Sequence, residues 1–248
     1  ISVMYTFFIP FYNEEIRKNL QKFLPILAKF ISLKINNNNK FILVNDGSTD
    51  KTKDLLIKFN KKIKNKNKII IINNDQNKGV GYSFKKALKI CKTKYIMSIP
   101  SDNDVPLINY NKYLKKNVDF VMFYKENMEI YSRNRFFLSM MFRMIYGYFF
   151  DVRVNYVQSP CIYKCKILKK INIHSQRMSF WPEVNIKMLK SKIRYAEIPM
   201  IFNNESIIDR TVSFLNFFEV IMQFIKNYFD INIINKKKYK FKAKKIYF

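Results

Sequence analysis

The sequence predicts an α/β protein with a mostly parallel, Rossmann-like sheet and helices on both faces. Apolar runs typical of strands alternate with segments whose apolar residues recur at helical spacing. In addition, four apolar runs each lead directly into a short polar cluster: Tyr12-Asn13-Glu14, Asn45-Asp46-Gly47-Ser48, Asn77-Lys78-Gly79 and Asp102-Asn103-Asp104. Because ligands of open α/β sheets bind outside the carboxyl ends of the strands, we expect these clusters to share one site.

The first strand is expected over Val3–Ile9, a nearly continuous apolar run that stops at Pro10, as a strand buried on both faces would. Asn13 is expected to cap the first helix, whose apolar residues run at helical spacing from Leu20 to Ile31. The next elements are a strand at Phe41–Val44, a helix capped by Asp50, a strand at Ile69–Ile72, a helix opened by Gly79 and a strand at Tyr95–Ile99.

The second half of the chain is less regular. Its pattern predicts a strand at Phe120–Phe123, an apolar helix at Phe136–Tyr148, a strand at Tyr156–Tyr163 and an extended segment at Ile198–Phe202. We divide the chain into one catalytic domain (1–212), an amphipathic C-terminal helix (213–235) and a basic-aromatic tail (236–248).

Composition limits the partners without choosing one. The 248 residues carry 46 Lys and Arg against 18 Asp and Glu, a formal net charge of +28, which suits nucleic acid, an anionic membrane or a phosphorylated substrate. The abundance of Lys, Asn and Ile is also what biased codon usage produces, so charge alone identifies no partner.

Neither a disulfide framework nor a membrane span is expected. The three cysteines, Cys91, Cys161 and Cys165, are too few and too unevenly spaced for disulfides or a zinc site, so we expect reduced thiols. The longest apolar stretch, Phe136–Phe150, is interrupted by Arg143, and no signal peptide is visible, so a cytoplasmic location is the default.

Four ordered motifs carry a family resemblance: Ile9-Pro10-Phe11-Tyr12-Asn13-Glu14-Glu15, Val44-Asn45-Asp46-Gly47-Ser48-Thr49-Asp50, Asn77-Lys78-Gly79-Val80-Gly81 and Asp102-Asn103-Asp104. In order and spacing they resemble the opening of family-2 glycosyltransferases with the GT-A fold, above all the branch of dolichyl- or polyprenyl-phosphate sugar transferases. The resemblance covers residues 1 to about 105 closely and the remainder more loosely. Each motif alone is weak, whereas four in order are specific.

The resemblance implies a nucleotide-sugar site made of Pro10, Tyr12, Glu14, Asp46, Lys78, Gly79 and Asp102. In the resembled family the position of Asp46 holds the nucleobase. Asp50 is the better cap for the following helix, so we expect the Asp46 carboxylate to be free for a ligand. The loop with Lys78 and Gly79 is expected to line the pocket.

Asp102 and Asp104 are the candidate ligands of Mg²⁺ or Mn²⁺. Transfer of a sugar requires that the negative charge of the departing nucleotide be stabilised, and these ions prefer carboxylate, phosphate and water oxygens. The resemblance implies that Asp104 is the direct ligand and that Asp102 contacts the sugar or ribose side. The alternative is a solvated acidic turn before Pro106.

Asp151 and Glu183 are the candidate catalytic acids, because they resemble the aspartate after an apolar helix and the acid that begins an acceptor-facing helix. A hydroxyl acceptor needs a general base. A lipid phosphate is already an anion, so with that acceptor either acid would position groups instead of removing a proton.

Arg133, Arg210 and Ser213 are the candidate contacts for an acceptor phosphate, with Arg135 and Arg153 as alternatives. Arg210 and Ser213 partly resemble the late Arg and Ser segment of the family, although the glycine usual between them is missing. His174 has no second His or Cys ligand near it in sequence and is expected to be a surface or hydrogen-bonded imidazole.

These observations favour an inverting, metal-dependent glycosyltransferase that moves a sugar from a UDP- or GDP-sugar to a polyprenyl phosphate or lipid-linked glycan. Phe136–Phe150, Phe214–Phe229 and the basic tail have the makeup of interfacial elements, so we expect peripheral membrane contact on the cytoplasmic face. Alternatives are transfer to a sugar hydroxyl in capsule, lipopolysaccharide or glycoprotein synthesis, and nucleotide transfer. A basic RNA- or membrane-binding module is the alternative from another class, and no nucleic-acid motif is present.

Overall fold

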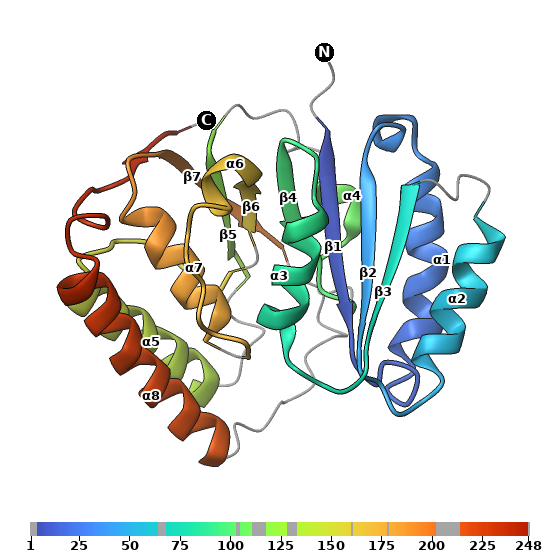
Figure 1. Ribbon diagram of the computed structural model, residues 1–248, viewed down its shortest axis with the longest axis horizontal. Coiled ribbons are helices and arrows are strands. Elements are labelled where there is room, and N and C mark those ends of the chain that lie inside the picture. Colours follow the sequence, from blue (N-terminus) through green and yellow to red (C-terminus); the bar gives the residue numbers. More distant parts are fainter. Residues whose placement is uncertain are drawn as a thin grey trace.

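The protein is described by a computed structural model over residues 4–63, 68–102, 105–110, 118–127, 133–159, 161–177, 179–201 and 214–247. It contains one eight-stranded sheet in the order β3-β2-β1-β4-β6-β5-β7-β8 (Figure 1). The strands are β1 (Tyr5–Phe11), β2 (Lys40–Asp46), β3 (Ile69–Asn74), β4 (Tyr95–Ser98), β5 (Phe120–Lys125), β6 (Cys161–Lys164), β7 (Arg194–Met200) and β8 (Lys244–Lys245).

The sheet is parallel apart from β6, which runs antiparallel to both β4 and β5. The neighbouring pairs β1 with β2, β2 with β3, β1 with β4, β5 with β7 and β7 with β8 are all parallel. The carboxyl ends of β1 to β5 and of β7 therefore lie at one edge, which we call the carboxyl edge. The expected sheet is confirmed.

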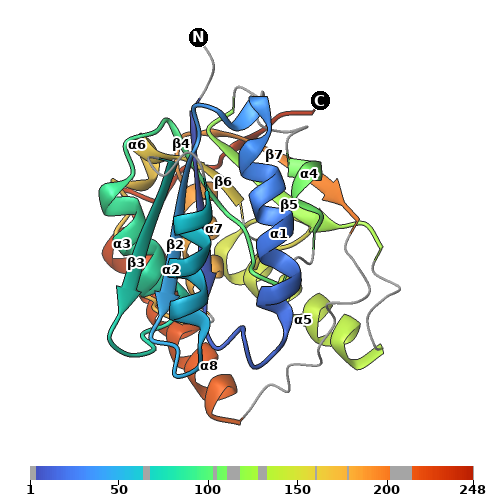
Figure 2. The same cartoon turned by 90° about the vertical axis from the view of Figure 1, so that its right-hand side faces the viewer.

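Helices cover both faces of the sheet, as Figure 2 shows for α1 and α3 on opposite sides of the strands. One buried apolar cluster joins the sheet to α1 (Asn19–Ser32), α2 (Thr52–Lys62) and α4 (Leu107–Tyr110). The other joins it to α3 (Val80–Ile90), α5 (Arg133–Phe150), α6 (Cys165–Leu168), α7 (Phe180–Leu189) and α8 (Phe214–Phe229). Two short helical segments, η1 (Lys34–Asn36) and η6 (Asp230–Ile234), follow α1 and α8.

The continuous apolar run in β1 is explained by this double cover. Phe7 packs against Phe30 of α1 with ring centroids 5.4 Å apart, whereas its neighbour Phe8 packs against Phe84 of α3 at 5.1 Å. Alternate residues of a strand point to opposite faces, so a central strand of this fold must be apolar at almost every position.

The first helix begins later than the sequence predicts. Asn13 has a left-handed φ of 51°, and α1 starts only at Asn19. The backbone N–H groups of Glu14 and Glu15 donate instead to the Thr52 hydroxyl, and a second bond joins Glu15 to Asp50. These donors are satisfied from the neighbouring loop, so no helical turn is needed there.

The predicted strand at Tyr156–Tyr163 is wrong in its first half, because strand pairing among the described residues begins at Cys161.

The basic tail is ordered over its described residues and forms β8 beside β7, with Tyr239 buried. All three cysteines are buried and free. Among the described residues, no helix has the length and apolar character required to span a bilayer.

Candidate active site

Three of the four polar clusters lie together at the carboxyl edge. Phe11, which ends β1, is paired with Asn45 of β2, and Asp46 is paired with Asn74 of β3. The turn after β1 also bonds to the turn after β2, because the N–H of Asn13 donates to the Ser48 hydroxyl at 3.0 Å. Asp102 follows β4, which runs parallel beside β1, although Asn103 and Asp104 lie outside the described residues.

Asp46 is buried and already engaged. Its Oδ1 accepts hydrogen bonds from Asn74 Nδ2 (2.7 Å), Ser83 Oγ (3.0 Å) and the Lys78 N–H (3.2 Å), and its Oδ2 accepts one from the Gly79 N–H (2.8 Å). A carboxylate offers about four acceptor sites. The expectation of a carboxylate left free for a ligand is therefore wrong, because Asp46 instead fixes the loop that follows β3.

That loop, residues 77–81, is held from its other side by the segment before α7. Gly79 has a φ of +89°, and a Cβ on it would lie 2.4 Å from the carbonyl oxygen of Gln176. The N–H of Gly81 donates to the same oxygen at 2.7 Å. Only glycine combines this φ with this close approach, so loop 77–81 is clamped between Asp46 and Gln176.

Lys78 and Tyr12 remain available at this edge, whereas Glu14 is committed. The Lys78 ammonium lies over the Tyr82 ring, 5.0 Å from its centroid, and Tyr12 is exposed. Glu14 is buried and accepts hydrogen bonds from Arg17 Nη1 at 3.4 Å and Asn19 Nδ2 at 3.3 Å. Pro10 lies within β1, in register with Val44.

The residues at this edge fit a hard divalent cation. Asp102 places a half-buried carboxylate in the turn after β4, the strand that pairs with β1. Oxygen ligands of this kind are those that Mg²⁺ and Mn²⁺ prefer. The second predicted ligand, Asp104, lies outside the described residues.

Asp151 lies at the other edge of the sheet. Its Oδ2 is 2.5 Å from the ammonium of Lys242, and both side chains are more than half exposed. Lys242 precedes β8, which pairs with the first residues of β7, so this ion pair marks the amino edge. A hydrogen bond from Lys242 also lowers the pKa of Asp151, which weakens it as a base. The predicted catalytic role of Asp151 is contradicted by this placement.

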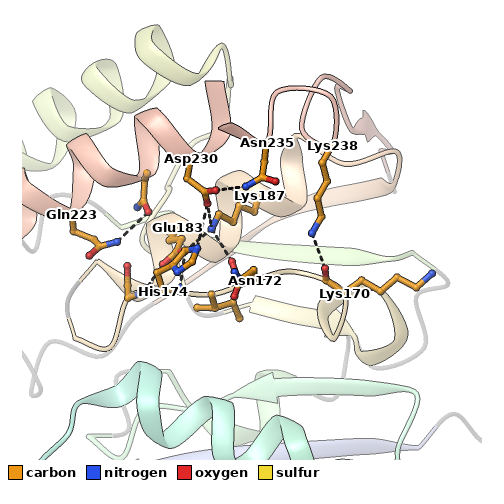
Figure 3. A network of polar contacts seen from close by, with 12 residues as sticks. Lys170, Asn172, His174, Glu183, Lys187, Gln223, Asp230, Asn235 and Lys238 are labelled. Carbon is orange, nitrogen blue, oxygen red and sulfur yellow. Dashed lines mark hydrogen bonds and ion pairs between the residues drawn. The ribbon is translucent and has the colours of Figure 1, made fainter. Parts of the chain in front are cut away.

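Glu183 is fully buried in the first turn of α7, within a network of polar contacts (Figure 3). Its Oε1 accepts from Lys187 Nζ at 2.6 Å and from the His174 N–H at 2.9 Å, and its Oε2 accepts from the Ser175 N–H at 2.7 Å. Burial by itself raises the pKa of Glu183, but Lys187 and these hydrogen bonds outweigh burial and lower it. The expected acceptor-facing acid is therefore wrong.

Lys187 and Asp230 were not anticipated from sequence. The fully buried Lys187 ammonium lies 2.6 Å from Glu183, 2.6 Å from Asp230 Oδ2 and 2.7 Å from the carbonyl oxygen of Asn172. We call these four residues the Lys187 cluster. His174, Glu183 and Asp230 offer ligand atoms close enough together for a metal ion, but the Lys187 ammonium already supplies the positive charge between the two acids. The signal in the sequence that could have predicted this cluster is an acid and a lysine at i and i+4 within an apolar helix.

Of the predicted phosphate contacts, the structure describes the side chains of Arg133 and Arg153. Arg133 is exposed at the beginning of α5, and Arg153 lines two cavities of about 360 and 370 Å³ beside the beginning of β7. Arg210 and Ser213 lie outside the described residues, as does the side chain of Arg135.

Comparison with solved structures places this fold among known enzymes. The chain matches a structure of glucosyl-3-phosphoglycerate synthase from Mycobacterium tuberculosis in complex with UDP at a TM-score of 0.63 and 14% identity, over 92% of this chain and 79% of that one. A complex of that enzyme with Mn²⁺, UDP-glucose and phosphoglyceric acid matches at 0.62 and 12%, over 91% and 80%. S. aureus TarS (residues 1–349) matches at 0.55 and 16%, over 94% and 74%. The fold is thus that of GT-A glycosyltransferases.

The family follows from the sequence itself. Residues 6–171, well over half of the chain, match the model of glycosyl transferase family 2. The chain belongs to this family, and the protein is a glycosyltransferase. A comparison with curated proteins found no match.

Proposed function

We propose that the protein transfers a sugar, with inversion, from a UDP- or GDP-sugar to a polyprenyl phosphate or a lipid-linked glycan. The donor half of this proposal is supported by the gathering of Tyr12, Lys78 and Asp102 at the carboxyl edge. It is supported too by a neighbour of the same fold that was solved with UDP.

We propose that Asp102 and Asp104 hold Mg²⁺ or Mn²⁺. When bound, the ion stabilises the negative charge that develops on the departing nucleotide diphosphate. Lys78 adds a second positive charge at the same edge, and the backbone of loop 77–81 fixes where it stands. Neither Asp151 nor Glu183 is retained as the base, so a phosphate acceptor, which needs none, fits better than a hydroxyl.

The observation that carries the lipid acceptor is an exposed apolar face on α5, α8 and η6, which we call the apolar helix face. Most of the exposed large apolar side chains among the described residues belong to it: Phe136, Phe137, Leu138, Met141, Met144, Ile145, Tyr148 and Phe149, with Phe218, Ile221, Met222, Ile225, Phe229, Ile233 and Ile234. Exposed apolar side chains concentrated on neighbouring helices are typical of a protein or membrane interface.

The two helices lie side by side at one end of the molecule (Figure 1). Phe224 of α8 packs edge-on against Tyr146, Phe149 and Phe150 of α5, with centroids 4.9 to 5.5 Å apart. Phe224 therefore lies between the two helices, whereas the apolar side chains named above are exposed.

The positive charge around the apolar helix face favours an anionic bilayer as the surface that this face contacts. Glu219 is the one acid in the sequence of α5 and α8, against four cations. Lys236, Lys237 and Lys238, all exposed, begin two positions after the end of η6. Apolar side chains flanked by lysine and arginine are the composition of interfacial helices on acidic lipids.

The first experiment measures sugar transfer from a panel of UDP- and GDP-sugars to polyprenyl phosphate in vesicles, with and without Mn²⁺. We expect transfer that requires the metal and falls at least about a hundredfold in Asp102→Ala. Asp54→Asn, which removes an exposed acid of α2, should keep wild-type activity. Transfer to a soluble glycan but not to the lipid would replace the acceptor part of the proposal, and hydrolysis or transfer of no nucleotide sugar would end it.

The second experiment measures co-sedimentation with phosphatidylglycerol and with phosphatidylcholine vesicles. We expect binding to the acidic vesicles, lost in Leu138→Glu and Phe218→Glu, whose side chains are 60% and 58% exposed on the apolar helix face. Ile35→Glu is the control, because Ile35 is an exposed apolar residue of η1, outside that face. If both variants still bind the acidic vesicles, the apolar helix face is not the membrane contact.

A further inference from the structure

The Lys187 cluster is an unusual feature, because it buries three charged groups between α7 and η6 (Figure 3). Removing charges from water is costly, and a buried ion pair often contributes no more stability than apolar residues of the same size. Asp230 alone would neutralise Lys187, so the presence of Glu183 calls for a separate reason.

Glu183 differs from Asp230 in what else it holds. Its two oxygens accept the N–H groups of His174 and Ser175, and its partner Lys187 donates to the carbonyl of Asn172. The segment 172–175 is thus fixed at three points by α7. Asp230, in contrast, forms an ion pair with Lys187 and accepts a hydrogen bond from Asn235 Nδ2, and His174 Nε2 lies 3.7 Å from its Oδ2.

The segment fixed by Glu183 is the one on which loop 77–81 rests. Gln176 follows Ser175 directly, and its carbonyl oxygen accepts from the Gly81 N–H. A Cβ on Gly81 would lie 2.7 Å from the Ser175 carbonyl oxygen, so loop and segment are in backbone contact. A displacement of 174–176 cannot occur without moving this side of loop 77–81.

We infer that Glu183 is a positioning residue for the nucleotide-sugar donor, acting through segment 172–176 on loop 77–81. Asp46 holds the loop from the sheet side and Glu183 holds it, through Gln176, from the α7 side. This inference rests on the proposed function in one respect, the identity of the donor. Glu183 itself touches no donor atom and exchanges no proton.

The test compares Glu183→Gln with Asp230→Asn in the full chain. Both remove one negative charge beside Lys187, but only the first replaces an oxygen that accepts a backbone N–H of the segment by an amide N–H₂. We expect amide hydrogen exchange at Gly79 and Gly81 to accelerate about tenfold or more in Glu183→Gln, with a similar rise in the Kd for UDP or GDP measured with Mn²⁺. Asp230→Asn should keep the wild-type exchange rates and the wild-type Kd, even if its melting temperature falls as far as that of Glu183→Gln.

Other outcomes decide the matter against the inference. Unchanged exchange at Gly79 and Gly81 in Glu183→Gln would overturn it, as would nucleotide affinities that track melting temperature in both variants. If wild-type protein binds neither UDP nor GDP, the proposed function fails while the exchange data still test the positioning. Should Glu183→Gln not fold, Gly81→Ala probes the contact from the loop side: faster exchange at Ser175 is expected, and unchanged exchange there would contradict the inference.

Discussion

Single residues at the carboxyl edge act mainly by fixing loops. Asp46 shows this most clearly, because a position expected to bind a ligand accepts four internal hydrogen bonds instead. The donors that would contact a nucleotide sugar stand on a loop whose shape Asp46 sets. Its substitution should therefore affect both folding and donor affinity.

Asp46→Asn tests this at the residue scale. An amide offers one acceptor oxygen and turns an N–H₂ toward the backbone donors of Lys78 or Gly79, so at least one donor loses its partner. We expect a loss of about 2 kcal/mol in the free energy of unfolding, together with a higher KM for the donor. Urea denaturation and donor titration measure the two effects. Asp75→Asn is the stability control, since Asp75 is exposed just beyond β3; equal losses in both variants would contradict the assigned role.

At the scale of elements, α5 and α8 form a pair with one buried seam and one exposed face. Phe224 lies in the seam, whereas Phe218, on the same helix, is exposed. Stability and membrane binding should therefore depend on different side chains of the same helix.

Phe224→Ala and Phe218→Ala separate these two roles. We expect Phe224→Ala to lower the free energy of unfolding by about 2 kcal/mol, because it removes apolar contacts with three rings of α5. Phe218→Ala should leave it within about 0.5 kcal/mol and weaken vesicle binding instead. Chemical denaturation and vesicle co-sedimentation give the two readouts, and a stability loss in Phe218→Ala as large as in Phe224→Ala would mean that its side chain is packed.

For the molecule as a whole, the scarce carboxylates carry much of the pH dependence. Burial by itself raises the pKa values of Asp119, Glu183 and Asp230, but Lys164 at 2.8 Å from Asp119 and Lys187 at 2.6 Å from the other two bring them below their ordinary values. A lowered folded-state pKa means that the unfolded chain binds more protons in acid.

Stability should therefore be at its full value above pH of about 5 and fall as the pH drops through the ordinary Glu value of 4.5 and the ordinary Asp value of 3.8 toward the folded-state pKa values. Urea midpoints at pH 7, 4.5 and 3.5 measure this fall. Glu183→Gln should be less stable at pH 7 yet lose less on acidification. Asp54→Asn, which removes an exposed carboxyl, should keep the wild-type slope; a slope unchanged in Glu183→Gln would exclude it as a contributor.

Much of the fold was predictable because its signals are local. The apolar runs of β1 to β5 and the helical spacing of α1, α3, α5 and α8 lie in single stretches of sequence, and alternation of strands and helices predicts a parallel sheet. The late start of α1 was not predictable in this way. Its cause is a pair of side chains, Asp50 and Thr52, that lie 35 or more positions further along the chain.

The sequence alone determined which polar residues follow which strands, and parallel pairing then brings those residues to one edge. Only the tertiary structure decided which of these acids are enclosed and bonded to neighbouring loops. Glu183 and Lys187 have the spacing of an ordinary exposed helix pair. Asp46 follows a strand, at a position where a ligand-binding residue is expected. Their burial and hydrogen bonds depend on partners outside the same helix or strand, Asp230 and His174 for the helix pair and Gly79 for Asp46, which local spacing does not encode.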